Sequence, residues 1–261
     1  ARGRESERYY KRPAKLNDIL CTGTLTVDTV KEDSASVHDG ALYAVTVFRD
    51  VLTSQGIEVL GRARKLDERF DTSAPLTLVF EHRSPPLTEV VNVINRNSQN
   101  FYAECLLKTL GRVVLNEGSF QAGCRVVQHF MKTRGVYCEG HQMVDGSGLS
   151  ARNRVSPRQL VEVIRMMDQG PLKDAWRASL PVGGVSGTLR TRFNQNNEAR
   201  NLAPRIMAKT GYIGGVRSLS GIVDRPGKSP LYFSIVLNGY RIGNSRTLDL
   251  IDRLALALAR D

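Results

Sequence analysis

Three short apolar stretches near the C-terminus constrain the fold of this chain more than any other feature. They read RIMAKTG, SLSGIV and LYFSIVLNG, and turn residues separate each from the next. Strands joined by such short turns pair antiparallel. A helical pattern follows, from about Arg246 to Arg260, with Ser245 in the position of an N-cap. The end of the chain therefore predicts an antiparallel sheet followed by a terminal helix.

The middle of the chain has the spacing of apolar residues that is typical of helices. One predicted helix begins after Asp39 and ends at Gly56, and a second begins at Leu87 and ends before the polar stretch Asn95–Asn100. A third begins near Ala103 and ends at Gly111, and a fourth begins at Ser119 and ends at Gly135. A fifth begins at Ser156-Pro157. Short strands are also predicted at Leu20–Val30, Ile57–Leu60 and Leu76–His82. Helices in the middle and a meander at the end predict an α/β fold, with an antiparallel sheet flanked by helices and a helical lobe.

Residues 1–36 differ in character from the rest of the chain. A basic arm occupies the first fifteen residues, and it contributes to a net charge of +11. Such a charge favours acidic partners, namely nucleic acid, anionic lipid or an acidic cell-wall polymer, although a solvated basic arm explains it equally well. No basic motif with interleaved aromatic residues points to nucleic acid, so we expect none as a partner. We interpret residues 1–36 as the tail of another module.

Cysteine and histidine spacing gives no indication of a metal or a cofactor. None of the four cysteines forms a C-x-x-C pair, and the four histidines form no H-E-x-x-H. Buried free thiols are one interpretation, and a disulfide between Cys124 and Cys138 in an oxidising compartment is another. No apolar run approaches the length needed to span a bilayer.

Lys209-Thr210-Gly211 is the first candidate for chemistry, because it lies on one of the predicted C-terminal strands. At the edge of a sheet a lysine can point into a cleft, and a glycine lets a substrate backbone approach closely. A surface hairpin is the alternative interpretation of these three residues. The tripeptide alone favours the hairpin.

Ser98-Gln99-Asn100 is the second candidate, on the predicted loop between two helices. A hydroxyl there can relay a proton, and a carboxamide can hold a substrate amide. Serine acyl-transferases combine three motifs in the order S-x-x-K, S-D-N and K-T-G, and the second and third lie on a helix–helix loop and on a strand. Here the second and third elements occur in that order and in those contexts. No serine in the chain is followed by lysine three positions later, so the first motif is missing.

A third stretch, DGSGLSARNRVSPRQL from Asp145 to Leu160, completes a family pattern. With SPPLTEVVNVINRNSQNFYAECLLKTLG, LPVGGVSGTLRTRF and AKTGYIGGVRSLSGIV, it resembles the D-alanyl-D-alanine carboxypeptidases/endopeptidases of the class C low-molecular-weight penicillin-binding proteins. The resemblance covers roughly Val37 to the C-terminus. It implies a penicillin-binding transpeptidase/β-lactamase-like fold that is incomplete here, with residues 37–261 as the C-terminal portion of the catalytic domain and residues 1–36 as the end of an inserted accessory domain or linker.

The resemblance also implies roles for individual residues. Ser98, Asn100 and Lys209 match catalytic positions, whereas Thr210, Gly211, Asp145 and Ser147 match substrate-binding positions. For the D-G-S-G loop, which ends at Gly148, we expect mainly a structural role. No cofactor and no metal are implied.

The function that follows from the resemblance is cleavage of peptidoglycan stem peptides through an acyl-enzyme, with β-lactams as covalent inhibitors and a periplasmic or extracytoplasmic location. The nucleophilic serine would lie outside this chain, upstream or on an N-terminal companion chain. We therefore expect residues 1–261 alone to be inactive. The alternative is a non-catalytic relative that keeps the cleft and binds wall peptides. A nucleic-acid-binding module has only the net charge in its favour.

Overall fold

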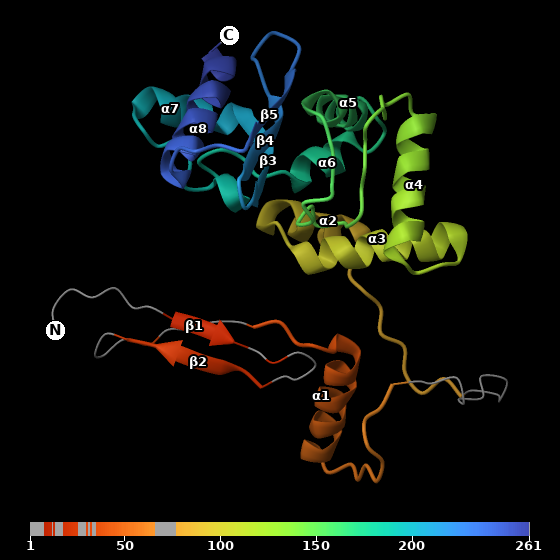
Figure 1. The fold of residues 1–261 in the computed structure, drawn as a ribbon. Helices are drawn as coiled ribbons and strands as arrows, with labels where there is room; N and C mark the ends of the chain where they lie inside the picture. Colours follow the sequence, from red (N-terminus) through yellow and green to blue (C-terminus); the bar gives the residue numbers. More distant parts are fainter. Residues whose placement is uncertain are drawn as a thin grey trace. The chain divides into compact units, whose positions relative to one another are not determined.

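The computed structural model describes residues 8–11, 13, 18–25, 30, 32, 35–65 and 77–260. Internal contacts divide the chain into two compact units, Ala1–Glu81 and His82–Asp261 (Figure 1). The boundary expected after residue 36 lies inside the first unit. The assignment of residues 1–36 to an inserted domain stays a prediction. Each unit is described by itself below.

The described residues of the first unit form a two-stranded sheet and a helix. Strands β1 (Arg8–Lys11) and β2 (Leu20–Gly23) pair antiparallel, and helix α1 spans Gly40–Ser54. The side chain of Asp39 accepts a hydrogen bond of 3.1 Å from the backbone N–H of Leu42, which confirms the predicted cap. The strand predicted at Leu20–Val30 is confirmed only over β2, and residues 26–29 lie outside the described part.

Two other strands predicted in this part of the chain are wrong. Residues 57–60 and 77–82 form no strand, and Leu76 lies outside the described residues. Their apolar composition matches a strand, but a strand also needs a neighbour with which to pair its backbone. Among the described residues no partner pairs with them, and the side chain of Val79 is 93% exposed.

The second unit begins with a group of helices. They are α2 (Leu87–Asn97), α3 (Asn100–Leu115), α4 (Phe120–Thr133), α5 (Pro157–Asp168) and α6 (Lys173–Ser179). The first four confirm the predicted helices, and the short α6 was not predicted. Ser156 and Gln159 form a capping box at the start of α5, as the Ser-Pro pair suggested.

Helix α3 continues one turn past Gly111, where the sequence predicted its end. A Cβ at Gly111 would lie 2.6 Å from the carbonyl oxygen of Glu117 and 2.8 Å from the Cβ of Ala122. A Cβ at Gly123 on α4 would lie 2.1 Å from the carbonyl oxygen of Leu107 on α3. Glycine therefore serves close packing of α3 against α4 here, and α3 ends instead at Leu115, with Asn116 as its C-cap at a φ of 56°.

The second unit ends with the predicted meander and helix. Strands β3 (Ile206–Ile213), β4 (Val216–Val223) and β5 (Leu231–Asn238) form an antiparallel sheet in that order, so β3 is an edge strand. Two turns of 3₁₀-helix, η1 (Gly187–Leu189) and η2 (Ala203–Arg205), and helix α7 (Asn197–Leu202) precede the sheet. Helix α8 spans Asn244–Arg260, so Ser245 lies inside it and is not its cap.

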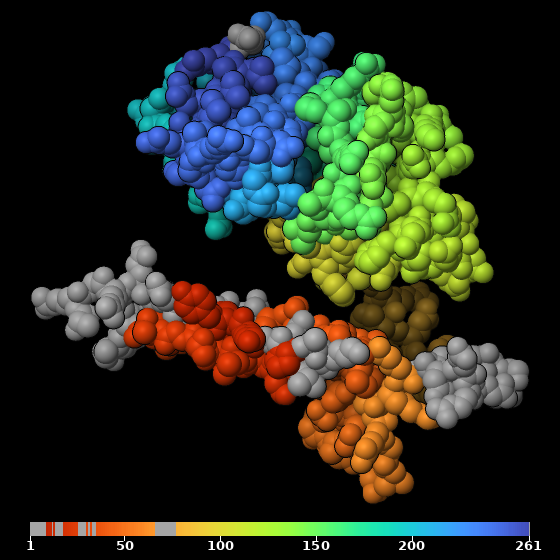
Figure 2. Space-filling model, viewed as in Figure 1, coloured from red at the N-terminus to blue at the C-terminus, as the bar shows by residue number. Residues whose placement is uncertain are grey.

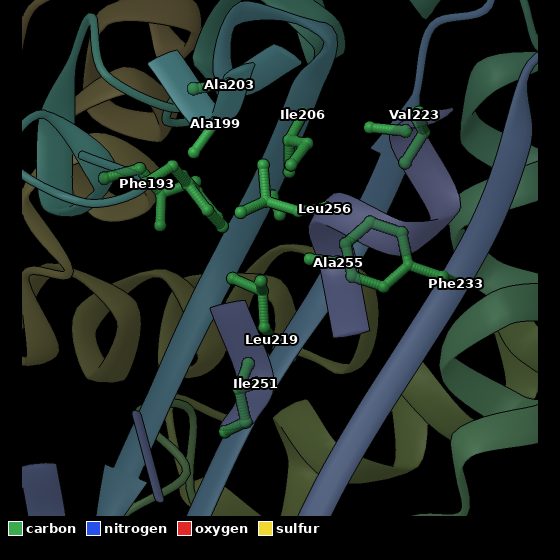
Figure 3. Close-up of a cluster of buried hydrophobic side chains, with 13 residues drawn as sticks. Phe193, Ala199, Ala203, Ile206, Leu219, Val223, Phe233, Ile251, Ala255 and Leu256 are labelled. Atoms are coloured by element: carbon green, nitrogen blue, oxygen red, sulfur yellow. The ribbon is translucent and has the colours of Figure 1, made fainter. Parts of the chain in front are cut away.

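Alternation along the strands gives the sheet two different faces. One face packs against α8 through a buried core, which includes Leu219, Phe233 and Ile251 (Figure 3). The other face packs against α5. In the space-filling view, the sheet with α8 (blue) and the helices α3 to α5 (green) form two adjoining parts of this unit (Figure 2). The predicted arrangement of an antiparallel sheet, flanking helices and a helical lobe is confirmed.

Two further observations concern the whole described part of the chain. None of its helices is both long and apolar enough to cross a membrane. Cys124 and Cys138 are not bonded to each other, and both are free thiols together with Cys21 and Cys105.

Candidate active site

The structure brings the two candidate motifs together. The ammonium Nζ of Lys209 on β3 donates a hydrogen bond of 2.7 Å to the hydroxyl Oγ of Ser98. The two residues are 111 positions apart in sequence, and they come from the two adjoining parts of the second unit. The same ammonium donates to the backbone carbonyl oxygen of Thr210 at 3.0 Å. The surface-hairpin interpretation of Lys209 is therefore wrong, because the side chain is directed at the second motif.

Ser98 is held between two helices by an unusual backbone conformation. It forms the C-cap of α2 with φ 55° and ψ 48°, which is the left-handed region that favours glycine. The break between the helices falls inside the polar stretch Asn95–Asn100, as predicted, but α2 continues to Asn97 and α3 already begins at Asn100. A non-glycine residue in this region costs of order 1 kcal/mol, and such residues cluster at functional sites. The conformation ends α2 and turns the chain into α3 with the hydroxyl of Ser98 directed at Lys209.

Lys209 lies in a half-buried position, which changes its proton affinity. Burial disfavours the charged ammonium, so the pKa of Lys209 is lowered from its usual value. A lysine with a lowered pKa gives up its proton more readily at neutral pH. The pair of Lys209 and Ser98 can therefore move a proton between an amine and a hydroxyl.

The edge of β3 is only partly covered. The backbone N–H of Ala208 donates to Pro181, and Gly183 donates to the carbonyl of Ile206. Every second residue of a strand faces the same edge, so Thr210 and Tyr212 continue this row. Beyond Gly183, no residue in the described ranges pairs with that edge. An extended chain can therefore add to β3 next to Lys209.

Thr210 and Gly211 shape the strand beside Lys209. The hydroxyl of Thr210 donates a hydrogen bond of 3.0 Å to the hydroxyl of Thr188 in η1. A Cβ at Gly211 would lie 2.4 Å from the hydroxyl of Ser218 on the neighbouring strand, so that hydroxyl fills the space beside the glycine. Gly211 and Lys209 share one face of the sheet, because they are two residues apart.

Asn100 lies at the first position of α3 and is exposed. Its neighbour Gln99 forms the N-cap, since the side-chain oxygen of Gln99 accepts from the backbone N–H of Phe101 at 3.3 Å. The middle residue of the S-x-N motif therefore caps α3. Ser98 precedes this cap and Asn100 follows it, so neither of their side chains is used to cap α3.

The D-G-S-G loop packs on the first turns of α3. Both backbone N–H groups of Gly146 and Ser147 and the hydroxyl of Ser147 donate to the carboxylate of Glu104, at 2.7, 3.1 and 2.5 Å. A Cβ at Gly146 would lie 2.4 Å from the carbonyl oxygen of Ala103. These contacts support the structural role that we expect for this loop.

The carboxylate of Asp145 accepts hydrogen bonds from the loop itself. Its oxygens accept from the backbone N–H groups of Gly148 and Ser150, at 2.9 and 2.7 Å, and from the side chain of Asn153 at 2.7 Å. The assignment of Asp145 and Ser147 to substrate binding stays a prediction.

Two further residues of this region were not predicted from the sequence. Glu104 lies one turn after Asn100 and has no motif around it. Thr188 lies in the stretch LPVGGVSGTLRTRF, which belongs to the family pattern but was given no role. The glycines of this stretch were a signal in the sequence that its backbone approaches another segment closely. No cluster of three His, Cys, Asp or Glu residues that could hold a metal ion occurs in the described ranges.

Comparisons with known proteins identify the family and the fold. The model of the D-Ala-D-Ala carboxypeptidase 3 (S13) family matches residues 1–261. The chain is 33% identical to a D-alanyl-D-alanine carboxypeptidase of Actinomadura sp. (strain R39) over 254 residues, which are 95% of this chain and 46% of that protein. The chain spans about half the length of the curated relatives it matches.

Solved structures show the same fold. Penicillin-binding protein 4 (dacB) of Haemophilus influenzae, solved with a β-lactam, has a TM-score of 0.81 and 23% identity, over 97% of this chain and 58% of that one. A variant of a reconstructed class A β-lactamase, the last common ancestor of Gram-negative bacteria, has a TM-score of 0.50 and 18% identity, over 84% and 81% of the two chains. The expected penicillin-binding, β-lactamase-like fold is confirmed.

Proposed function

Because the chain belongs to the D-Ala-D-Ala carboxypeptidase 3 (S13) family, we propose that it is part of a serine-type D-Ala-D-Ala carboxypeptidase or endopeptidase. The substrates are peptidoglycan stem peptides, which place the enzyme outside the cytoplasmic membrane. Carboxypeptidase action removes the terminal D-alanine through an acyl-enzyme, and β-lactams acylate the same serine.

One observation carries this proposal. The ammonium of Lys209 lies 2.7 Å from the hydroxyl of Ser98, directly beside an open strand edge. Acyl transfer to a serine needs a proton donor for the leaving amine and an extended binding surface for the peptide. The pair and the edge supply both within a few ångströms of each other.

The proton steps follow from the hydrogen bonds. As the nucleophile attacks the carbonyl of the penultimate residue, its hydroxyl proton passes to the lysine of the S-x-x-K motif, which returns it when the acyl-enzyme is hydrolysed. The C–N bond to the terminal D-alanine breaks, and its nitrogen takes up a proton. Ser98 gives that proton from its hydroxyl and regains one from the ammonium of Lys209. The lowered pKa of Lys209 favours this transfer. Water then hydrolyses the acyl-enzyme, and the pair accepts the proton that water releases.

The binding steps use the strand and the helix beside it. The stem peptide adds to the edge of β3 at Thr210 and Tyr212 as an extra strand. The hydroxyl of Thr210 donates to the terminal carboxylate, and Gly211 belongs to the same binding strand by its place in the K-T-G motif. Asn100 holds a peptide amide with its carboxamide.

The nucleophile is the part of this mechanism that residues 1–261 do not contain, since no S-x-x-K occurs in them. We assign it to another part of the protein or to an N-terminal companion chain. The share of the relatives that this chain spans, about half, supports that assignment.

The test uses the natural full-length protein that contains this chain. We expect it to release D-alanine from an acylated Lys-D-Ala-D-Ala peptide and to form a covalent band with labelled penicillin. Lys209→Ala should slow acylation about 10²–10³-fold, which is typical for the loss of one catalytic hydrogen-bond donor. Lys173→Ala, at an exposed position on α6, serves as the control and should be acylated at the normal rate.

Two results would change the conclusion. A full-length protein that binds stem peptides but is never acylated would be the non-catalytic relative considered above. Residues 1–261 produced alone should form no penicillin adduct, and a labelled band from them would place the nucleophile within this chain.

A further inference from the structure

The segment from Ala178 to Thr188 has no role in the mechanism above, yet it touches both halves of the site. Its first part holds the end of α2. The guanidinium of Arg96 donates to the carbonyl oxygen of Ala178 at 2.6 and 3.1 Å, and the amide of Asn95 donates to the hydroxyl of Ser179 at 2.7 Å. Both donors come from the last turn of α2, directly before Ser98.

The next residues of the same segment hold β3. The carbonyl oxygen of Pro181 accepts from the backbone N–H of Ala208 at 3.0 Å, and Gly183 donates to the carbonyl of Ile206 at 2.9 Å. These bonds end directly before Lys209. The segment therefore fixes the distance between the Ser98 loop and the Lys209 strand.

Gly187 lets the end of this segment lie against the Ser98 loop. Its φ of +58° is in the left-handed region, and a Cβ there would lie 2.6 Å from the carbonyl oxygen of Arg96. This close approach places the next residue, Thr188, beside β3. The hydroxyl of Thr188 then accepts the hydrogen bond of 3.0 Å from Thr210.

The pair of threonine hydroxyls has a consequence for binding. A hydroxyl has one hydrogen, and the hydrogen of Thr210 is directed at Thr188 in the free protein. To donate to a carboxylate, Thr210 must turn that hydrogen away from Thr188. Thr188 can then donate its own hydrogen to Thr210, and such a chain of hydroxyls strengthens the outer hydrogen bond.

We propose that Thr188 is a positioning residue for recognition of the substrate's terminal carboxylate. It orients Thr210 in the free protein and becomes the hydrogen-bond donor to Thr210 when a carboxylate binds. This inference rests on the proposed function, because it takes the carboxylate of the stem peptide as the ligand of Thr210.

The test measures binding to the full-length protein separately from turnover. The probe is an acyl-D-Ala-D-Ala peptide whose scissile carbonyl is reduced to a methylene, and its C-terminal amide is the uncharged control. Thr188→Val keeps the size of the side chain and removes the hydroxyl. We expect it to weaken binding of the free carboxylate about 10-fold, the upper end for one hydrogen bond between neutral hydroxyls, and to leave binding of the amide unchanged.

Thr188→Ser is the matched variant, since it keeps the hydroxyl, and we expect it to retain the wild-type preference for the carboxylate. In turnover, Thr188→Val should raise KM about 10-fold with kcat within about threefold of wild type. Equal loss for carboxylate and amide, no loss for Thr188→Val, or equal impairment of the serine variant would each overturn the inference.

The two proposals fail in different ways. Full-length protein that prefers the carboxylate through Thr188 but releases no D-alanine would refute the enzyme and keep the inference. Normal turnover with an unaffected Thr188→Val would refute the inference and keep the enzyme.

Discussion

At the residue scale, the half-buried position of Lys209 has a cost to stability. Its ammonium is held in a half-buried position by Ser98 and by a backbone carbonyl. Burial lowers the pKa of Lys209 from its usual value. Since the unfolded chain binds the proton more tightly than the folded one, this group lowers stability wherever it is charged in the folded state, and stability rises with pH up to the unfolded pKa near 10.5.

We predict that Lys209→Met removes this dependence. The variant loses activity, yet its unfolding free energy relative to wild type should be highest at pH 7 and should fall as pH rises to 10. Denaturant unfolding of both proteins at several pH values measures the difference between their unfolding free energies. Titrating groups that the two proteins share contribute equally to both and cancel in this difference. A difference that stays constant with pH would contradict the assigned cause.

How far the sequence predicts individual residues depends on whether a motif marks them. Lys209 and Ser98 belong to ordered motifs, and the structure joins them as expected. Glu104 and Thr188 act through contacts between elements distant in sequence, so no local pattern indicates them. Gly111 was misread as a helix stop, because a glycine that packs closely and one that caps look alike in a sequence.

At the element scale, α3 links several parts of the site. It begins at Asn100, its second turn binds the D-G-S-G loop through Glu104, and its last turns pack on α4 through Gly111. Three donors converge on the carboxylate of Glu104. A shift of this one helix would therefore move the loop and the candidate binding residue together.

We predict that Glu104→Gln destabilises the protein by about 2 kcal/mol, since the amide nitrogen of glutamine would face a backbone N–H that it cannot satisfy. Glu89→Gln, at an exposed position on α2, should change stability by less than about 0.5 kcal/mol. Thermal unfolding of both variants tests this. Equal effects would mean that the loop does not depend on Glu104.

Helices and strands were predicted well where the sequence pattern that indicates them lies within the element itself. The meander, α1, α2, α4 and α5 each show their apolar periodicity within one segment, and α1, α4 and α5 also begin with a side-chain cap. The strands expected at Ile57–Leu60 and Leu76–His82 failed, because pairing depends on a second segment that periodicity does not show. The short α6 and α7 have too few turns for periodicity to mark them.

At the scale of the second unit as a whole, a buried ion pair joins the helices to the sheet. Arg177 on α6 binds Asp168 at the end of α5, with 2.9 Å between Nη2 and Oδ2, and Asp224 after β4 at 3.0 Å. The hydroxyl of Tyr232 on β5 also donates to Asp168 at 2.9 Å. The hydrogen bond from Arg177 is the main reason why the pKa of Asp168 is lowered, and the one from Tyr232 adds to it.

We predict that Asp168→Asn lowers the unfolding free energy at pH 7 by about 3 kcal/mol, because it leaves a buried arginine partly unpaired. A lowered folded pKa gives stability above the unfolded value of 3.8, and that stability is lost as pH falls through the folded value. The difference between variant and wild type should therefore shrink from pH 5 to pH 2. Asp174→Asn, on an exposed site of α6, should stay within about 1 kcal/mol of wild type at every pH.

The left-handed backbone at Ser98 has an evolutionary consequence. Glycine or asparagine would adopt that conformation with less strain than serine does, so folding and the proposed catalytic role favour different residues at this position. If the proposed hydrolysis were no longer selected for in a descendant of this protein, the backbone would favour glycine or asparagine at position 98, opposed only by the hydrogen bond that Ser98 accepts from Lys209. Descendants that bind peptides without turning them over should therefore show an early substitution at position 98, while the sheet and the neighbouring helices stay intact.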